Sequence, residues 1–352
     1  MIALGLVYDR RGKPAQAEST LVKAVEEARA ALGEENDITI KAKADLGLVY
    51  SDEGKHAEAE PLLTEALEYW RRVGGEEHPE TLTCMTNLGF AYFRAGKYAQ
   101  AGPLFVEALA IRRRVLGEEH QDTLRSMNNL AMTYRMEGKY VEAEGLLVKG
   151  ADISRRILGE DHPDTLRRIH NLGLTYRDAG RYSVAMPLLF KALEGRRRVL
   201  GEEHPDTLTS LDALASAYYH ERKYAQAEPL LVKLHAYQTR TLGAAHPETL
   251  ATMNELAKLY EVRGNPAEAA RWKREGESAK QSAHRPSGPS AEERLVANVS
   301  DGGQDCRRHN NNNRLDTRDA DADRRGLAAR DGQLFMAFRD PRMPTRREGR
   351  IC

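Results

Sequence analysis

Apolar residues recur at steps of three and four positions in the middle of the chain. Leu124, Met127, Leu130, Ala131 and Tyr134 fall on one stripe, and this spacing predicts a helix with one buried face. A glycine at position 138 follows the stripe, as glycine does where a chain turns into the left-handed region after a helix. We therefore expect a helix that starts near residue 122 and is stopped by this glycine.

A second apolar stripe follows within residues 139–158. Tyr140, Ala143, Leu147 and Ile153 carry it, and Gly159 comes directly after it. Two helices joined by a tight turn form a helical hairpin. Because one hairpin alone cannot bury both stripes, we expect it to stack on further hairpins of the same kind.

The hairpin pattern returns at a fixed interval of 42 residues. Nearly the same nine residues occupy positions 116–124, 158–166 and 200–208 (LGEEHQDTL, LGEDHPDTL and LGEEHPDTL), and weaker copies begin at residues 32, 74 and 242. One leucine recurs, followed each time by glycine or alanine, at positions 46, 88, 130, 172, 214 and 256. The pattern predicts one partial and six full hairpins across residues 1–281, with the small residue allowing the two helices to approach closely.

The repeated nine residues are interpreted as a signal that ends one helix and starts the next. Gly201 ends a helix, and Pro205 suits the first position of the following one because its missing N–H is not needed there. His204 then stands at or beside the N-cap. One copy departs from the pattern, since Arg222 stands where other hairpins have glycine, and a left-handed conformation there would be strained.

These features resemble the tetratricopeptide repeat: leucine followed by a small residue, tyrosine four positions after the leucine, and alanine early in the second helix. The 42-residue period, the G-E-E-H-P-D-T-L turn and the N-N-L at residues 128–130 resemble more narrowly the kinesin light chain type. The resemblance covers residues 1–281. It implies an all-α, right-handed α-solenoid whose first helices line a concave groove for peptides or partner proteins.

The face of each first helix opposite the apolar stripe supplies the candidate binding residues. Asn87, Asn129 and Asn171 share one repeat position, an asparagine side chain can donate and accept together, and the resemblance implies that this asparagine holds a peptide backbone. Neighbouring arginines would select acidic side chains or a free carboxylate. The predicted peptide-binding set is Asn87, Arg125, Asn128, Asn129, Arg135, Arg167, His170, Asn171 and Arg177. The same residues could instead brace adjacent repeats, and the sequence leaves both interpretations open.

Charge and metal-ligating residues add little to this picture. The chain has 53 basic and 53 acidic residues, so no net charge favours nucleic acid or an anionic membrane. Arginine runs at residues 112–114 and 196–198 lie at helix ends beside acidic residues, which favours an interaction with the helix dipole over a nucleic-acid stripe. Histidines spaced one repeat apart are too distant to share a zinc ion. We expect neither a metal nor a cofactor.

The search for catalytic motifs and targeting segments does not favour another function. The acidic pairs such as Glu202–Glu203 are turn residues copied in each repeat, and we find no nucleophile elbow, phosphate loop or zinc-protease motif, so we do not expect an enzyme. Cys84, Cys306 and Cys352 are scattered, which favours a reducing compartment. The opening apolar stretch MIALGLVY is too short to span a membrane. The expected location is the cytoplasm.

The two ends of the chain differ from the repeats. Met1 aligns with Lys43 of the next repeat, so the first hairpin lacks its opening turn and a half. Residues 282–352 contain no lysine, an RPSGPS segment and a polar run, and this composition predicts a disordered tail. We predict a non-catalytic protein-interaction scaffold. The alternative is a sensor or regulatory arm of a larger bacterial-type signalling protein whose effector domain is missing from this chain, and a weak nucleic-acid binder is a third possibility.

Overall fold

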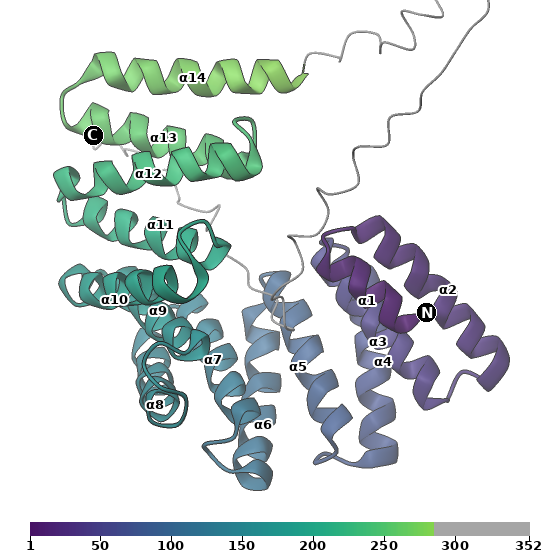
Figure 1. Ribbon diagram of the computed structural model, residues 1–352. Helices are drawn as coiled ribbons and strands as arrows, with labels where there is room; N and C mark the ends of the chain where they lie inside the picture. Colours follow the sequence, from purple (N-terminus) through teal and green to yellow (C-terminus); the bar gives the residue numbers. More distant parts are fainter. Residues whose placement is uncertain (285–352) are drawn as a thin grey trace, which may run out of the picture. The chain divides into compact units, whose positions relative to one another are not determined.

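The computed structural model describes residues 1–284, which form fourteen α-helices and no strand (Figure 1). The all-α prediction is confirmed for this part of the chain. Within it, no helix is both long and apolar enough to cross a membrane. In chain order the helices are α1 (Ile2–Arg10), α2 (Pro14–Leu32), α3 (Asp37–Asp52), α4 (His56–Gly74), α5 (Pro79–Arg94), α6 (Tyr98–Leu116), α7 (Gln121–Met136), α8 (Tyr140–Leu158), α9 (Pro163–Asp178), α10 (Tyr182–Leu200), α11 (Pro205–His220), α12 (Tyr224–Leu242), α13 (Pro247–Val262) and α14 (Pro266–His284).

The chain divides into two compact units, residues 1–237 and 238–352, with the boundary inside α12. In the first unit each helix from α1 to α10 packs against the helix that follows it, so the hairpins stack in chain order. In the second unit α13 packs against α14. The predicted tandem hairpins are therefore present. The predicted tail lies outside the described residues from position 285 onward, and the boundary at residue 281 stays a prediction.

Histidines begin the first helix of five hairpins. The Nδ1 atom of His78 accepts a hydrogen bond from the backbone N–H two residues later, at 3.2 Å. The other four make the same contact at 3.1–3.3 Å; they are His120, His162, His204 and His246. This contact satisfies one of the N–H groups that a helix start leaves without a partner. The predicted capping role is confirmed.

The threonine of the repeated D-T-L closes the turn from the other side. Thr123 Oγ1 donates to the Gly117 carbonyl at 2.7 Å, and Thr207 Oγ1 donates to the Gly201 carbonyl at 2.8 Å. These threonines are buried, and the glycines have φ of +86° and +90°. Glycine is needed there because side chains disfavour such angles. The turn is thus built from a glycine, a histidine cap and a threonine hydroxyl.

The small residue after each repeated leucine is required by close helix packing. A Cβ atom on Gly89 would lie 2.8 Å from the Phe105 ring, and one on Gly173 would lie 2.7 Å from Leu189. Both distances are well below ordinary van der Waals contact. The prediction that the two helices of a hairpin approach closely at this position is confirmed.

Arg222 is strained as predicted. Its φ is +60°, and among the described residues it is the one non-glycine residue with a positive φ. Other turns between the helices of a hairpin place a glycine at this position, such as Gly138 with φ +77° and Gly180 with φ +74°. The backbone keeps the left-handed turn, and the Cβ atom of Arg222 makes this conformation energetically unfavourable.

Candidate functional site

A row of polar contacts joins α7 to α9. Gln121 Nε2 donates to Asp164 Oδ2 at 3.3 Å, and Asn171 Nδ2 donates to Asn128 Oδ1 at 2.8 Å. A third contact, described below, joins the C-terminal ends of the two helices. The α7 members are seven residues apart, which is about two helical turns, so they share one face. We call this row the polar seam; it consists of Gln121, Asn128, Arg135, Asp164, Asn171 and Asp178.

The third contact of the polar seam gathers two of the predicted arginines around one carboxylate. Arg135 Nη1 lies 2.9 Å from Asp178 Oδ2, and Arg177 Nε donates to Asp178 Oδ1 at 2.9 Å. The Arg135 side chain is buried, and this burial lowers the pKa of its guanidinium. Asp178 therefore balances two of the arginines in the predicted peptide-binding set.

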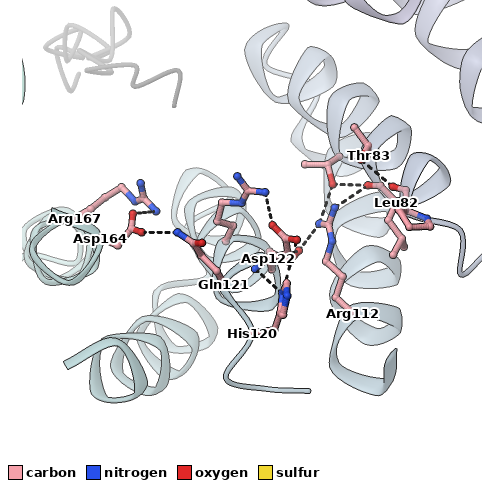
Figure 2. A network of polar contacts seen from close by, with 12 residues as sticks. Leu82, Thr83, Arg112, His120, Gln121, Asp122, Asp164 and Arg167 are labelled. Atoms are coloured by element: carbon pink, nitrogen blue, oxygen red, sulfur yellow. Dashed lines mark hydrogen bonds and ion pairs between the residues drawn. The ribbon is translucent and has the colours of Figure 1, made fainter. Parts of the chain in front are cut away.

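The other two predicted arginines each pair with an aspartate three residues earlier. Arg125 forms an ion pair with Asp122, and Arg167 Nη2 lies 2.7 Å from Asp164 Oδ1. Figure 2 shows Asp164 between Arg167 and Gln121, so this carboxylate also belongs to the polar seam. Although burial favours the neutral carboxyl, the charge of Arg167 lowers the pKa of Asp164. Asp164 is thus an anion at neutral pH.

His170 turns toward α11 rather than toward the polar seam. Its Nδ1 atom lies 3.2 Å from Ser210 Oγ, and Ser210 Oγ also accepts a hydrogen bond from Arg196 Nη1 at 2.7 Å. Burial, aided by the positive charge of Arg196, lowers the pKa of His170 well below its usual value. The imidazole is therefore neutral at neutral pH and contributes hydrogen bonding without charge.

The asparagines differ in their surroundings. Asn171 is buried and bonded to Asn128, whereas Asn87, Asn128 and Asn129 are half-buried. The structure thus brings together Asn128 with Asn171 and Arg135 with Arg177. It leaves Asn87 apart on α5. The bracing interpretation gains a direct contact at the Asn128–Asn171 pair, and peptide binding by the nine residues stays a prediction.

Four acceptors of this site were missed from sequence: Asp122, Asp164, Asp178 and Ser210. A signal existed for the first two, because aspartate and arginine three residues apart on a helix face each other. The Arg135–Asp178 and Asn128–Asn171 contacts carry no such local signal, since each crosses from one hairpin to the next.

The arginines at the ends of the second helices also have partners. Each joins an acidic residue in the turn one repeat earlier, and the pairs are Arg72–Glu35, Arg114–Glu77, Arg156–Glu119 and Arg198–Asp161. The guanidinium groups of these four arginines are thus balanced one for one by carboxylates. This pairing weakens the case for a nucleic-acid stripe, because phosphates would have to displace carboxylates already in place.

Known proteins share these repeats. The family model described as tetratricopeptide repeat matches residues 1–68, 41–101, 85–151, 127–196 and 213–282. The crystal structure of a variant of a Podosopora anserina putative kinesin light chain with nearly identical TPR-like repeats is 30% identical and has a TM-score of 0.51. That match covers 58% of this chain and 96% of the other.

Two further solved structures share the fold at lower identity. BtubC (BKLC) from P. vanneervenii is 23% identical over 65% of this chain and 92% of its own, with a TM-score of 0.54. The apo form of the quorum sensor NprR from B. thuringiensis is 15% identical over 79% of this chain and 74% of its own, with a TM-score of 0.61. A search of curated proteins gave no match.

Proposed function

The chain belongs to the tetratricopeptide repeat family, and we propose that it is a non-catalytic scaffold that binds a peptide segment of a partner protein along α5, α7 and α9. The observation that carries this proposal is the polar seam. There, amide, guanidinium and carboxylate groups from consecutive hairpins meet within hydrogen-bonding distance. An extended peptide needs such groups at regular steps, because its own N–H and C=O groups recur along its length.

The asparagines supply the sequence-independent part of the proposed recognition. Asn87 and Asn129 are half-buried. Part of each side chain therefore faces solvent and is accessible to a ligand that displaces water there. Neither amide makes a hydrogen bond to another side chain in the described part of the chain. Each can therefore donate to a peptide carbonyl and accept from a peptide N–H.

The arginines supply the charge preference. Arg125 and Arg177 are paired with aspartates of their own helices, and a carboxylate from a ligand can compete for these guanidinium groups. Such pairs are favourable when the geometry is bidentate. We propose a ligand with an acidic side chain or a free carboxylate. The proposed location remains the cytoplasm, as expected from the scattered cysteines.

Affinity capture from the source cell tests the proposal. Three baits are compared: the full chain, an Asn129→Ala/Asn171→Ala variant, and a Val141→Ala control altered at a highly exposed position on α8. We expect a partner that the full chain and the control retain and the double variant loses, with unchanged helix content by circular dichroism. If the folded double variant retains the same proteins, binding does not depend on these asparagines.

The regulatory alternative remains second. A signal transduction ATPase with a tetratricopeptide repeat sensor from Pyrococcus horikoshii shares the fold at 13% identity, with a TM-score of 0.59. That likeness speaks for the fold alone, so it does not assign a sensor role here. Sequencing the gene's flanking regions would decide between the two, since an effector domain in the same reading frame would support the sensor arm.

A further inference from the structure

A repeated three-residue contact joins neighbouring hairpins in the first unit. Glu60 on α4 accepts hydrogen bonds from the Tyr92 hydroxyl at 3.0 Å and from Lys97 Nζ at 2.8 Å. Two repeats later, Glu144 on α8 accepts from the Tyr176 hydroxyl at 2.7 Å and from Arg181 Nη1 at 2.8 Å. One carboxylate thus serves a tyrosine and a cation of the next hairpin.

The repeat between these two lacks the carboxylate. Gly102 on α6 stands where the others have Glu60 and Glu144, while Tyr134 and Lys139 keep the two donor positions. The donors are also in place spatially. Lys139 Nζ lies 5.6 Å from the centre of the Tyr134 ring, as Lys97 Nζ lies 5.5 Å from the Tyr92 ring. Within residues 1–284, no group accepts a hydrogen bond from the Tyr134 hydroxyl.

The cation at this junction can take one more carboxylate. Lys139 Nζ contacts Glu137 at 2.8 Å. In the first full hairpin the equivalent Lys55 contacts both Glu53 at 2.7 Å and Glu18 at 2.8 Å. Glu53 corresponds to Glu137, and Glu18 corresponds to Gly102. An ammonium group has three protons to donate, so Lys139 can accommodate a second acceptor with its existing partner in place.

Space is present beside the missing side chain. A Cβ built on Gly102 would meet no atom closer than Thr133 Cγ2 at 4.0 Å. At the Lys139 end of the junction, an open pocket of about 500 Å³ is lined by Gly96, Lys97, Tyr98, Ala99, Gln100, Glu137 and Lys139. By contrast, the corresponding junction two repeats later carries Met186, whose side chain is buried. Gly102 itself is buried, but no side chain occupies the position that Met186 fills two repeats later.

We infer that this junction is a binding site for a carboxylate supplied from outside the chain, held by the Tyr134 hydroxyl and Lys139 Nζ. The carboxylate would take the position that Glu60 and Glu144 take in their own junctions. Its source is either a small carboxylic acid or an acidic side chain of a protein, and the chemistry is the same for both. The site does not involve the asparagines of the proposed peptide-binding surface and stands independently of it.

Titration by NMR tests the site with Thr133 as the reporter, because its methyl carbon faces the space at Gly102. The full chain, labelled at threonine methyl groups, is titrated with propionate, with propionamide, and with N-acetylglutamate amide. We expect a saturable shift of the Thr133 methyl signal with the two carboxylates and none with neutral propionamide. Stronger binding of N-acetylglutamate amide than of propionate assigns the source as a protein side chain, and equal binding assigns it as a small acid.

Two variants make the test specific. Gly102→Glu supplies the carboxylate internally and should abolish the propionate-induced shift, while Tyr134→Phe should weaken binding roughly tenfold by removing one donor to a charged acceptor. The converse variant, Glu60→Gly, should create a second site. In a sample labelled at alanine methyl groups, this site is reported by Ala91, which occupies the repeat position of Thr133. Asn129→Ala should leave the Thr133 shift unchanged, which separates this site from the proposed peptide surface.

The inference is overturned by either of two results. One is the absence of a saturable shift in the full chain up to about 100 mM propionate, since even weak carboxylate sites fill in that range. The other is an equal shift in the Gly102→Glu variant, which would place propionate elsewhere.

Discussion

Arg112 on α6 donates a hydrogen bond from Nη1 to Ser126 Oγ on α7 at 2.6 Å, and one repeat later the two residue types are exchanged. Ser154 on α8 stands at the repeat position of Arg112, and Arg168 on α9 stands at that of Ser126. Arg112 also donates to the carbonyl of Leu82 at 3.1 Å (Figure 2). Each of these interfaces between hairpins holds one guanidinium and one hydroxyl, whichever helix supplies them.

The exchanged pair, Ser154 and Arg168, makes fewer hydrogen bonds than the arginine–serine pairs of the neighbouring interfaces. Arg168 is 1% exposed, and its Nε and Nη2 atoms, like Ser154 Oγ, have no hydrogen-bond partner in the described part of the chain. The stem of Arg168 lies against Gly150, where a Cβ would be 3.4 Å from Arg168 Cδ. In the next interface Arg196 Nη1 donates to Ser210 Oγ at 2.7 Å. The interface thus has room for one long side chain and pairs it with a short one.

Ser154→Arg should therefore destabilise the chain, because it places two guanidinium groups in an interface that holds one. We expect a loss of about 2 kcal/mol from overpacking and charge repulsion. Adding Arg168→Ser restores the arrangement of the neighbouring interfaces and should recover about 1–2 kcal/mol of that loss as coupling between the two sites. Urea unfolding of the two single variants and the double variant measures this coupling. Purely additive changes would contradict the exchange.

Arg222→Gly should stabilise the chain. The residue has φ of +60°, which costs a side-chain-bearing residue roughly 1–2 kcal/mol, and glycine offsets part of that gain through its greater freedom when unfolded. The net expectation is about 1 kcal/mol, seen as a higher urea midpoint. Arg222→Ala is the control, since alanine keeps the strain and should leave the midpoint unchanged. A stabilisation by alanine as large as that by glycine would point to the lost charge instead.

Asp45 should make stability depend on pH. It occupies the repeat position of Asn87, its Oδ2 atom is buried without a hydrogen-bond partner, and burial raises its pKa to about 6. A carboxyl whose pKa is raised on folding stabilises the fold fully below its unfolded value, near 3.9, and this contribution is lost as the pH rises through about 6.

Asp45→Asn removes that titration and introduces the residue type of the next three repeats. We expect the variant to be more stable than the wild type at pH 7.5, by on the order of 2 kcal/mol, and equal to it near pH 4. Unfolding of both chains between pH 4 and 8 gives the difference as a curve that rises between about pH 4 and 6 and is level above that range. A constant difference across this range would show that Asp45 does not titrate there.

The buried and exposed ion pairs should differ in their response to removal of the aspartate. Asp178→Ala leaves the buried Arg135 without its carboxylate, and an uncompensated buried cation costs about 3 kcal/mol. Asp152 pairs with Arg155 at 2.9 Å, but both side chains are about half exposed. Asp152→Ala should therefore change stability by less than about 1 kcal/mol. Comparable losses from the two variants in urea unfolding would mean that Arg135 finds another partner.

The helices and their packing could be predicted from the sequence because they depend on local rules. The glycine and histidine of each turn and the small residue after each leucine act within one hairpin, and a 42-residue period copies them in register. Arg222 was identified in the same way, as a single departure from a column of glycines. Such features can be predicted without knowing which side chain of a neighbouring hairpin lies opposite.

Side-chain contacts between neighbouring hairpins could not be predicted by comparing residues at equivalent repeat positions. Asn128 meets Asn171 and Arg135 meets Asp178 at a separation of 43 residues, one more than the repeat. The offset arises from how neighbouring helices align, so a residue faces the neighbour of its copy rather than the copy itself. Comparison down the asparagine column therefore suggested a ladder of equal residues, whereas Asn171 bonds the residue before Asn129.

This offset separates two asparagines that repeat symmetry makes equivalent. Asn171→Ala removes the 2.8 Å hydrogen bond to Asn128 and leaves that amide oxygen without its donor, which should cost about 1 kcal/mol of stability. Asn129→Ala breaks no side-chain hydrogen bond among the described residues, so its stability should stay within about 0.5 kcal/mol of the wild type. If the proposed peptide surface is correct, both variants should lose the captured partner despite their different stabilities. A partner lost only with Asn171→Ala would mean that this asparagine acts by bracing α7 against α9, and that the ligand contacts other residues.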